Sequence, residues 1–236
     1  MSAVHVFVTG SSRGIGAAIV QSLEASGARV LGHGRSDGPG RIGADLNDPA
    51  AVAGLFDRAL ERLDGRVDVL INNAGVFEAA PVDASDEAWS AQWARTMQIN
   101  LQAAADLSRL AVLHFRRTGG GRIVNVASRA AYRGDSPEHW HYAASKAGMI
   151  GMTKSIARGF SGEGILAFAI CPGFVRTEMA EEALQGATGA KILSEIPLGR
   201  VAEPEEVGRA AAWLALEAPA SMTGAVVDLN GASFVR

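Results

Sequence analysis

The amino-acid sequence predicts an α/β protein, a doubly wound domain in which a parallel sheet has helices on both faces. Short apolar runs alternate with longer helical stretches from one end of the 236-residue chain to the other. The short runs are apolar on both faces, which is typical of parallel strands covered by helices. No repeat, low-complexity tract or Pro/Ser-rich linker interrupts the alternation, so we expect one domain over residues 1–236.

The predicted strands are short runs rich in β-branched and aliphatic residues. They cover Val4–Thr9, Arg29–His33, Val67–Asn72, Arg122–Ala127, Ile165–Cys171 and Ala225–Leu229. The stretches between them are long enough to be helices that return the chain to the start of the next strand. The predicted helices cover Gly14–Ser26, Pro49–Leu63, Asp86–Arg117, Trp140–Phe160 and Pro204–Leu216.

Composition excludes several classes of protein. Hydrophobic residues make up 48% of the chain and charged residues 20%, which supplies a core and argues against disorder. A net charge of -3 gives no general attraction to nucleic acid or to an anionic membrane. The single Cys171 cannot form an internal disulfide, and no apolar run reaches the roughly 18 residues that span a bilayer. We therefore expect a cytoplasmic protein with neither nucleic acid nor membrane as a partner.

A glycine-rich loop joins the first predicted strand to the first predicted helix. It contains Gly10, Gly14 and Gly16, which let the backbone turn sharply and approach a pyrophosphate at the helix N-terminus. A purely structural turn is the alternative for such a loop taken alone. The order strand, loop, helix at the start of the chain favours dinucleotide binding by a Rossmann-type domain.

The pair Tyr142 and Lys146 predicts acid/base chemistry. Residues four apart on a helix project from the same face. A phenol has a pKa near 10, and a neighbouring ammonium stabilises the phenolate and lowers that pKa towards neutrality. The alternative is an exposed pair with no function, and the spacing alone does not exclude it.

These motifs, together with Asn72–Gly75, Asn100 and Ser128, resemble the short-chain dehydrogenase/reductase family. The resemblance continues through 171–177 and 197–200 to Asn230-Gly231, so it covers essentially the whole chain. It implies that Tyr142 is the acid in reduction and the base in oxidation, that Lys146 lowers its pKa and holds the nicotinamide ribose, and that Ser128 binds the substrate carbonyl. It also implies that Asn100 binds a water linking Lys146 to solvent.

The cofactor is predicted to be NADP(H) rather than NAD(H). An acid at the end of the second strand would bind the ribose 2′-hydroxyl of NAD, whereas a basic residue accommodates the 2′-phosphate of NADP. The chain has no acid there but has Arg35 and Ser36, with Arg13 in the glycine loop as a second cation. A solvated loop charge is the alternative for Arg35.

The resemblance extends the predicted cofactor site to further segments, with Asp45 at the adenine and Asn72 as neighbouring scaffold. An acid that caps a turn or a helix is the alternative for Asp45, which Asp48-Pro49 beside it makes credible. The whole predicted set comprises Gly10, Ser12, Arg13, Gly14, Ile15, Gly16, Arg35, Ser36, Asp45, Leu46, Asn72, Ala74, Gly75, Tyr142, Lys146, Pro172, Gly173, Val175 and Thr177.

The substrate is predicted to be a carbonyl compound or secondary alcohol, either a small molecule or a group on an acyl carrier. The pattern is most similar to 3-oxoacyl-acyl-carrier-protein reductases, and a basic patch of Arg116, Arg117, Arg122 and Arg129 would suit an acidic carrier. Glu163, where many carrier-dependent members have a basic residue, counts against a carrier. Small cyclic ketones, sugars and steroid-like alcohols are the alternatives. The predicted substrate contacts are Arg129, Tyr132, His139, Trp140, Phe174, Met179 and Leu184.

The resemblance also implies a homotetramer. Residues 174–200 have a helical pattern that Gly186 and Gly189 interrupt, which predicts a mobile substrate lid. His139 and His141 have no nearby carboxylate or cysteine cluster, so no metal site is expected. An NADP(H)-binding redox sensor without turnover stays open as an alternative, although it would not need the proton relay. An epimerase or dehydratase of the same superfamily is a further alternative. Such members are usually longer than this sequence beyond the position of Gly231, which counts against it.

Overall fold

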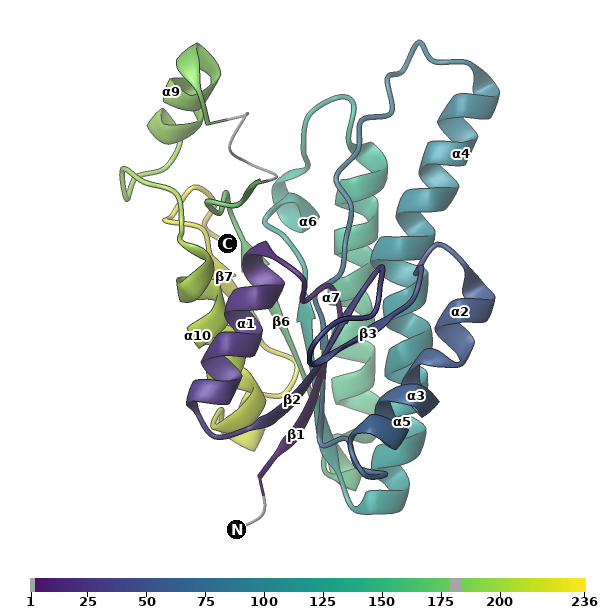
Figure 1. Ribbon diagram of the computed structural model, residues 1–236. Coiled ribbons are helices and arrows are strands. Elements are labelled where there is room, and N and C mark those ends of the chain that lie inside the picture. The colour runs from purple at the N-terminus through teal and green to yellow at the C-terminus, as the bar shows by residue number, and fades with distance from the viewer. Residues whose placement is uncertain (1–2, 179–183) are drawn as a thin grey trace.

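The computed structural model describes residues 3–178 and 184–236, and it contains a seven-stranded sheet in which every neighbouring pair is parallel. The strand order is β3-β2-β1-β4-β5-β6-β7 (Figure 1). The strands are β1 His5–Val8, β2 Arg29–Gly34, β3 Arg41–Gly43, β4 Val69–Asn72, β5 Gly121–Val126, β6 Ile165–Pro172 and β7 Val226–Leu229. The predicted fold class is confirmed.

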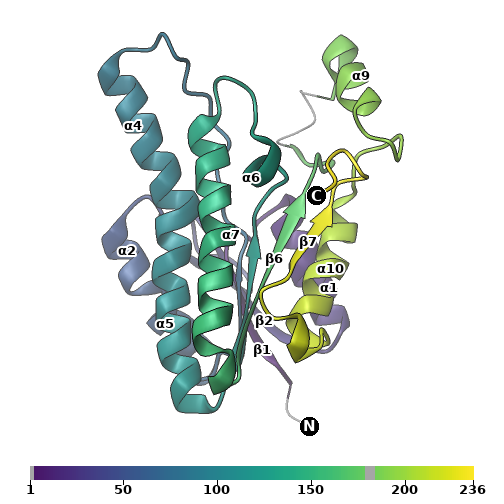
Figure 2. The same ribbon diagram turned by 180° about the vertical axis from the view of Figure 1, so that it is seen from behind.

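Helices cover both faces of the sheet, and the alternation of side chains in the strands explains why. Val6 and Val8 in β1 belong to the core under α1 (Gly14–Ala25) and α10 (Pro204–Leu216). Phe7, between them, points to the opposite face and joins a core with α5 (Ala103–Thr118). The helix α7 (Trp140–Phe160) covers that second face beside α5, as Figure 2 shows from behind.

The order of the strands reverses between β1 and β4, which lie side by side. The chain leaves β1 towards β2 and β3 on one side, and β4 begins the run β4 to β7 on the other. In open α/β sheets, ligands bind at the carboxyl ends of the strands at this switch point. The glycine loop after β1 and the Asn73–Gly75 segment after β4 meet there, where Thr9 Oγ1 accepts hydrogen bonds from the backbone N–H groups of Asn73 (3.0 Å) and Ala74 (3.1 Å).

Three local features differ from the sequence prediction. The strand β3 was not predicted, because it has only three residues, Arg41–Gly43, and lies among glycines. The predicted helix Pro49–Leu63 is divided at Gly54 into α2 (Pro49–Ala53) and α3 (Leu55–Arg62). The predicted helix Asp86–Arg117 consists of α4 (Asp86–Met97), a π-helical turn (Gln98–Gln102) and α5.

Of two short helices at the carboxyl ends of the strands, the first was not predicted and the second lies in a segment for which a helical pattern was predicted. They are α6 (Ala130–Arg133), directly after β5, and α9 (Gly186–Ser194), which lies within the segment predicted as a lid. Part of that segment, residues 179–183, lies outside the described residues, so the lid stays a prediction. In the part of the chain that is described, no helix is long and apolar enough to cross a membrane.

Candidate active site

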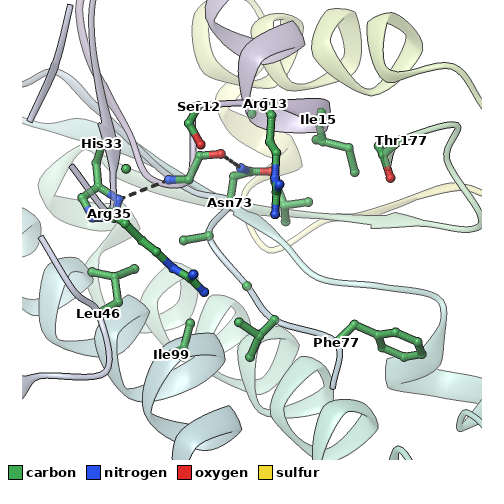
Figure 3. A pocket seen from close by; sticks show the side chains of 18 of the residues that line it. Ser12, Arg13, Ile15, His33, Arg35, Leu46, Asn73, Phe77, Ile99 and Thr177 are labelled. Carbon is green, nitrogen blue, oxygen red and sulfur yellow. Dashed lines mark hydrogen bonds between the residues drawn. The ribbon is translucent and has the colours of Figure 1, made fainter. Parts of the chain in front are cut away.

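A pocket of about 590 Å³ opens at the switch point and extends from the end of β2 to the start of α7. Figure 3 shows its glycine-loop side. The residues that line it and were predicted from the sequence are Gly10, Ser12, Arg13, Gly14, Ile15, Gly16, Arg35, Ser36, Asp45, Leu46, Ala74, Gly75, Ser128, Tyr142, Lys146, Pro172, Gly173 and Thr177. Segments from six different strand ends therefore converge on one cavity.

Contacts with Asn73 fix the glycine loop. The Asn73 side-chain amide donates to the carbonyl oxygens of Thr9 (3.0 Å) and Gly10 (2.9 Å), and the second of these bonds is drawn in Figure 3. At Gly16, a Cβ would lie 2.0 Å from the Gly10 oxygen, so no larger residue fits between helix and loop. The loop glycines therefore serve close backbone packing as well as access for a ligand.

His33, at the end of β2, was not predicted as a site residue but lines the pocket and is buried. Its Nε2 lies 3.1 Å from the Ala44 carbonyl oxygen, and its Nδ1 lies 3.3 Å from the Gly10 backbone nitrogen. A carbonyl only accepts and a backbone N–H only donates, so Nε2 carries the proton and Nδ1 accepts. Burial lowers the pKa of His33, which keeps this neutral form. The ring thus connects the glycine loop to the chain after β3.

Cationic side chains gather at the β2 end of the pocket. Arg35 and Ser36 lie there as predicted, and the Arg35 side chain extends into the pocket towards Leu46 and Ile99 (Figure 3). Arg41, which the sequence analysis missed, adds a second arginine on the same wall, and its Nε donates to the Ser36 carbonyl oxygen at 3.2 Å. Arg41 becomes a neighbour of Arg35 only because β3 pairs with β2.

Arg13 and Asp45 also lie on the wall, each with a partner in the protein. The Arg13 guanidinium forms an exposed ion pair of 3.4 Å with Glu178, so the glycine loop and the segment after β6 meet across the pocket. Asp45 Oδ1 accepts the Asn47 backbone N–H at 2.9 Å. The turn role considered for Asp45 is therefore present, together with its position on the pocket wall.

Ser128, Tyr142 and Lys146 lie together at the other end of the pocket. Tyr142 and Lys146 lie in the first two turns of α7, and Ser128 follows β5. The Ser128 side chain lies close enough to the Tyr142 hydroxyl to lower the pKa of the phenol. Ser128 Oγ also accepts the Ala130 backbone N–H at 3.1 Å, which leaves its own proton available for donation. Lys146 Nζ donates to the Val126 carbonyl oxygen at 2.9 Å and lies 5.8 Å from the centre of the Tyr142 ring.

The predicted net lowering of the Tyr142 pKa towards neutrality is wrong for this arrangement, because burial has the larger effect on the phenol. Burial raises the pKa of Tyr142 to about 12, and Ser128 opposes that rise only in part. Burial also lowers the pKa of Lys146 to about 8. Desolvation acts against the charged form of both groups and is the largest effect on the pKa of each. At neutral pH the phenol holds its proton.

Asn100 lies behind the pocket and is fully buried in the π-helical turn. Its side chain donates to the Val76 carbonyl oxygen (3.0 Å) and accepts the Val76 N–H (2.8 Å), as a neighbouring strand would. Gly75 separates Asn100 from Lys146, since a Cβ on Gly75 would lie 3.3 Å from Asn100 Oδ1 and 3.4 Å from Lys146 Nζ. Turns of this π type occur frequently at functional sites.

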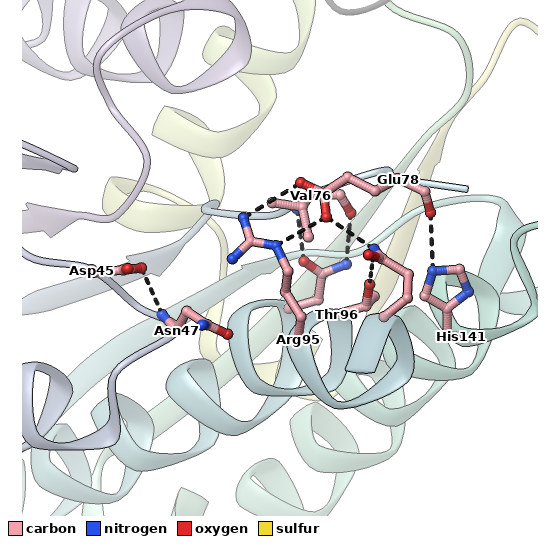
Figure 4. A network of polar contacts seen from close by, with 9 residues as sticks. Asp45, Asn47, Val76, Glu78, Arg95, Thr96 and His141 are labelled. Atoms are coloured by element: carbon pink, nitrogen blue, oxygen red, sulfur yellow. Dashed lines mark hydrogen bonds and ion pairs between the residues drawn. The ribbon is translucent and has the colours of Figure 1, made fainter. Parts of the chain in front are cut away.

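A network of polar contacts holds the segment after Gly75, which forms one wall of the pocket (Figure 4). The Glu78 carboxylate accepts hydrogen bonds from Arg95 (3.0 Å) and Gln92 (2.9 Å) of α4, and these bonds lower its pKa. The Glu78 carbonyl oxygen accepts from His141 Nε2 of α7 at 3.0 Å. The wall is therefore anchored to two helices.

The predicted substrate contacts lie in different surroundings. His139 stacks on Phe77 at 3.8 Å between ring centres, and Phe77 meets the Tyr142 ring edge-on at 4.8 Å. Arg129 lies over Phe174, whereas Tyr132 stacks on Phe234. Trp140 is half exposed, Leu184 is partly buried, and Met179 lies outside the described residues.

Three residues of the predicted site do not line the pocket. Asn72 is buried in the sheet, where its amide donates to Asn125 (2.8 Å) and Ser108 (3.0 Å). The Val175 side chain packs in the core under α10, and Asn100 lies behind the wall. Asn73 lies in the Asn72–Gly75 motif but was not itself predicted as a site residue. The other lining residues that the sequence analysis missed carry no motif signal or belong to unpredicted segments: His33, Gly34, Arg41, Ala44, Val76, Phe77, Glu78, Ile99, Val126, Ala127 and Glu178.

The fold and the pocket together define a class, the Rossmann-type dinucleotide-binding oxidoreductases. A family model described as enoyl-(acyl carrier protein) reductase matches residues 10–231. The chain is 33% identical to the 3-oxoacyl-[acyl-carrier-protein] reductase FabG of Escherichia coli (strain K12), over 97% of this chain and 96% of that protein. It is 33% identical to an acetoacetyl-CoA reductase of Rhizobium meliloti (strain 1021), over 96% and 97% of the two chains.

A solved structure agrees with these relatives. The crystal structure of a protein assigned as an NAD(P)-dependent gluconate 5-dehydrogenase from Beutenbergia cavernae, with NADP bound at low occupancy, superposes with a TM-score of 0.88. The two chains are 32% identical, and the match covers 98% of this chain and 96% of that one. The chain belongs to the short-chain dehydrogenase/reductase family, and it is an oxidoreductase of alcohol and carbonyl groups.

Proposed function

We propose that the protein is an NADP(H)-dependent reductase of a carbonyl compound, in which Tyr142 delivers the proton. The observation that carries this proposal is the placement of Tyr142, Ser128 and Lys146 together at one end of a pocket whose other end holds Arg35 and Arg41. A pocket that is cationic at one end and has a proton donor at the other suits a phosphorylated dinucleotide with its substrate.

The preference for NADP(H) is supported by the charges around the end of β2. Arg35, Arg41 and Ser36 line that end of the pocket, and β2 ends in Gly34 without an acid. Arginine binds a phosphate with a planar fork of donors. The gluconate dehydrogenase structure has NADP bound, which agrees with a preference for NADP(H) over NAD(H).

In the proposed reaction, the residues of this chain bind, orient and protonate the substrate. When bound, NADPH supplies the hydride that the carbonyl carbon accepts. Ser128 donates a hydrogen bond to the carbonyl oxygen, and this bond strengthens as negative charge develops there. Tyr142 gives its proton to the same oxygen, and the Lys146 ammonium stabilises the phenolate that remains. The products are a secondary alcohol and NADP⁺.

The specific reaction to test first is reduction of a 3-oxoacyl thioester, because two relatives carry names of that chemistry. The arginines considered for carrier docking do not support a carrier. Arg116 forms an ion pair with Glu163 at 2.6 Å, and Arg122 donates to the carbonyl oxygens of Leu214 (3.0 Å) and Ala218 (2.9 Å). Both lie near the amino end of β5, opposite the pocket. The structural neighbour is named as a gluconate 5-dehydrogenase, so small hydroxy acids are the second candidate class of substrate.

The decisive experiment follows NADPH oxidation by the purified protein with 3-oxoacyl thioesters, on a carrier and on coenzyme A, and with a panel of small ketones. We expect turnover with NADPH that exceeds turnover with NADH. If ketones are reduced but no thioester is, the 3-oxoacyl assignment is rejected and the general reductase proposal stands. Tight NADPH binding without turnover of any substrate would favour the redox-sensor alternative.

The variant Tyr142→Phe tests the assigned proton donor. We expect it to lower kcat by about 10² to 10⁴, the usual contribution of a general acid, and to keep its affinity for NADPH. Calorimetry of NADPH binding, together with the steady-state rate, measures both effects. A variant with nearly full activity would assign the proton transfer to another group.

A further inference from the structure

Arg129 is a buried cation directly after the pocket residue Ser128, and no part of the proposed reaction uses it. Its side chain is 93% buried (7% exposed), and its Nη1 is shielded from solvent without a hydrogen-bond partner. The residue directly follows Ser128, and its backbone N–H donates to the Pro172 carbonyl oxygen at 3.0 Å. It is therefore fixed between two segments that line the pocket.

The surroundings of the guanidinium leave its charge without a direct partner among residues 3–178 and 184–236. One face lies over the Phe174 ring, 4.9 Å from the ring centre. The nearby Glu195 forms an ion pair with Arg133 at 3.5 Å, and no described carboxylate lies within ion-pair distance of Arg129. An aromatic face holds a guanidinium while its edges stay free to donate hydrogen bonds.

A buried, unpaired arginine is costly, which indicates that something else completes the site. Nearly all buried polar groups in folded proteins are hydrogen-bonded, and an isolated buried charge is strongly unfavourable. Burial lowers the pKa of Arg129, but an arginine side chain stays charged. A planar guanidinium matches a carboxylate with two parallel hydrogen bonds.

The position of Arg129 defines where that anion belongs. Consecutive Cα atoms are about 3.8 Å apart, so the residue that donates to the substrate carbonyl is the immediate neighbour of the unpaired cation. One small molecule can therefore meet Ser128 and Tyr142 with its carbonyl oxygen and Arg129 with a group a few bonds away. Phe174, on the segment after Gly173, provides an apolar surface against the guanidinium.

We infer that the substrate is a small oxo acid, whose free carboxylate pairs with Arg129 while its ketone is reduced at Tyr142. This inference rests on the proposed reductase function and specifies its substrate. In the reaction, hydride from NADPH forms the new C–H bond, the carbonyl π bond opens, and the Tyr142 proton completes the hydroxyl group. The products are a hydroxy acid and NADP⁺, and the carboxylate is unchanged.

The test compares each of three oxo acids with its neutral methyl ester: 3-oxobutanoate, 4-oxopentanoate and 5-oxohexanoate. The ratio of kcat/KM for acid over ester is measured with saturating NADPH for the wild type, Arg129→Met and Arg129→Lys. The matched control is Arg133→Gln, an exposed arginine of the same helical segment. We expect the wild type to prefer at least one acid and Arg129→Met to lower that ratio by about ten- to a hundredfold, the range for a hydrogen bond to a charged group. Arg129→Lys should keep part of the preference.

Several results would overturn the inference. They are a wild type that prefers all three esters, an Arg129→Met variant with an unchanged ratio, and an Arg133→Gln variant that lowers the ratio as much. A loss of thermal stability in Arg129→Met with an unchanged ratio would show that the guanidinium serves only the fold.

A second readout does not depend on turnover. The corresponding 3-, 4- and 5-hydroxy acids, added with NADP⁺, should raise the melting temperature of the wild type more than that of Arg129→Met. No stabilisation of the wild type by any of them would reject the anion site. If the esters and neutral ketones are reduced and the acids are not, the proposed function stands and this inference fails. If no carbonyl compound is reduced at all, the proposed function itself fails.

Discussion

Burial moves the pKa values of Tyr142 and Lys146 in opposite directions, to about 12 and about 8. The phenol is therefore a proton donor throughout the neutral range, as reduction requires. The limiting group is Lys146, which carries its charge below its pKa and loses it above. A neutral Lys146 cannot stabilise the phenolate that forms when Tyr142 gives up its proton.

This difference predicts the pH dependence of reduction. We expect kcat/KM for NADPH to be constant below about pH 8 and to fall above it, because that parameter reports the ionisation of the free enzyme. A profile from pH 6 to pH 10 with a ketone substrate measures the effect. The variant Lys146→Met should have a low rate without the fall near pH 8. A wild-type rate that instead rises through pH 8 would mean that reduction uses another proton donor.

Arg41 gives a second prediction at the scale of one residue. Its position beside Arg35 and Ser36 predicts a contact with the 2′-phosphate, so Arg41→Gln should weaken NADPH binding by about tenfold or more and NADH binding much less. Calorimetric titrations of both nucleotides measure the change. Arg29→Gln, at the opposite end of β2 where Arg29 pairs with Asp64, is the matched control. Equal losses for NADPH and NADH in Arg41→Gln would exclude recognition of the phosphate.

At the scale of elements, the π-helical turn between α4 and α5 connects the active site to the pocket wall. Asn100 supplies both partners for the Val76 backbone, and Gly75 lies between Asn100 and Lys146. In this π turn, the Asn100 side chain supplies the donor and the acceptor that a neighbouring strand would otherwise supply to the Val76 backbone. The turn thus positions the wall and the lysine together.

Removing that amide should destabilise the fold. In Asn100→Ala, the N–H and C=O of the partly buried Val76 lose their partners, at up to about 1–3 kcal/mol for each unsatisfied group. We expect the free energy of unfolding in urea to fall by about 2–4 kcal/mol, within this range for two groups. Gln102→Ala, in the same turn but exposed, should change it by less than about 0.5 kcal/mol. Equal effects of the two substitutions would show that the Val76 contacts contribute little.

The elements and residues that the sequence predicted are those with local signals. The bounds predicted for the helices Trp140–Phe160 and Pro204–Leu216 match the structure in full. Pro204 and a capping box mark the start of the second helix, and glycines or strands lie beside both helices in the sequence. Gly10, Tyr142 and Lys146 lie within short motifs whose spacing can be read directly. Arg41, His33 and Glu78 have no motif, since β-strand pairing and loop packing bring them to the pocket. Asn72 and Val175 belong to the motifs but face the core.

At the scale of the whole molecule, the outer surface of α7 has the features of a helix–helix interface. Ala144, Ala147 and Gly151 are exposed and follow one another at intervals of three and four residues, so they form a stripe of small residues along the helix. Leu113 on the adjacent α5 is also exposed. Small residues let two helices approach closely, and an exposed leucine beside them adds apolar area to be buried.

This surface supports the predicted homotetramer and gives a test of it. We expect size-exclusion chromatography with light scattering to give four times the mass of one chain for the wild type. Ala147→Glu would place a charge in the stripe, where desolvating it on association costs several kcal/mol, so the mass should fall to that of a dimer or monomer. Ala53→Glu makes the same change at an exposed position of α2 and should leave the tetramer intact. A tetramer that survives Ala147→Glu would exclude the α7 stripe as an interface, and a monomeric wild type would exclude the tetramer itself.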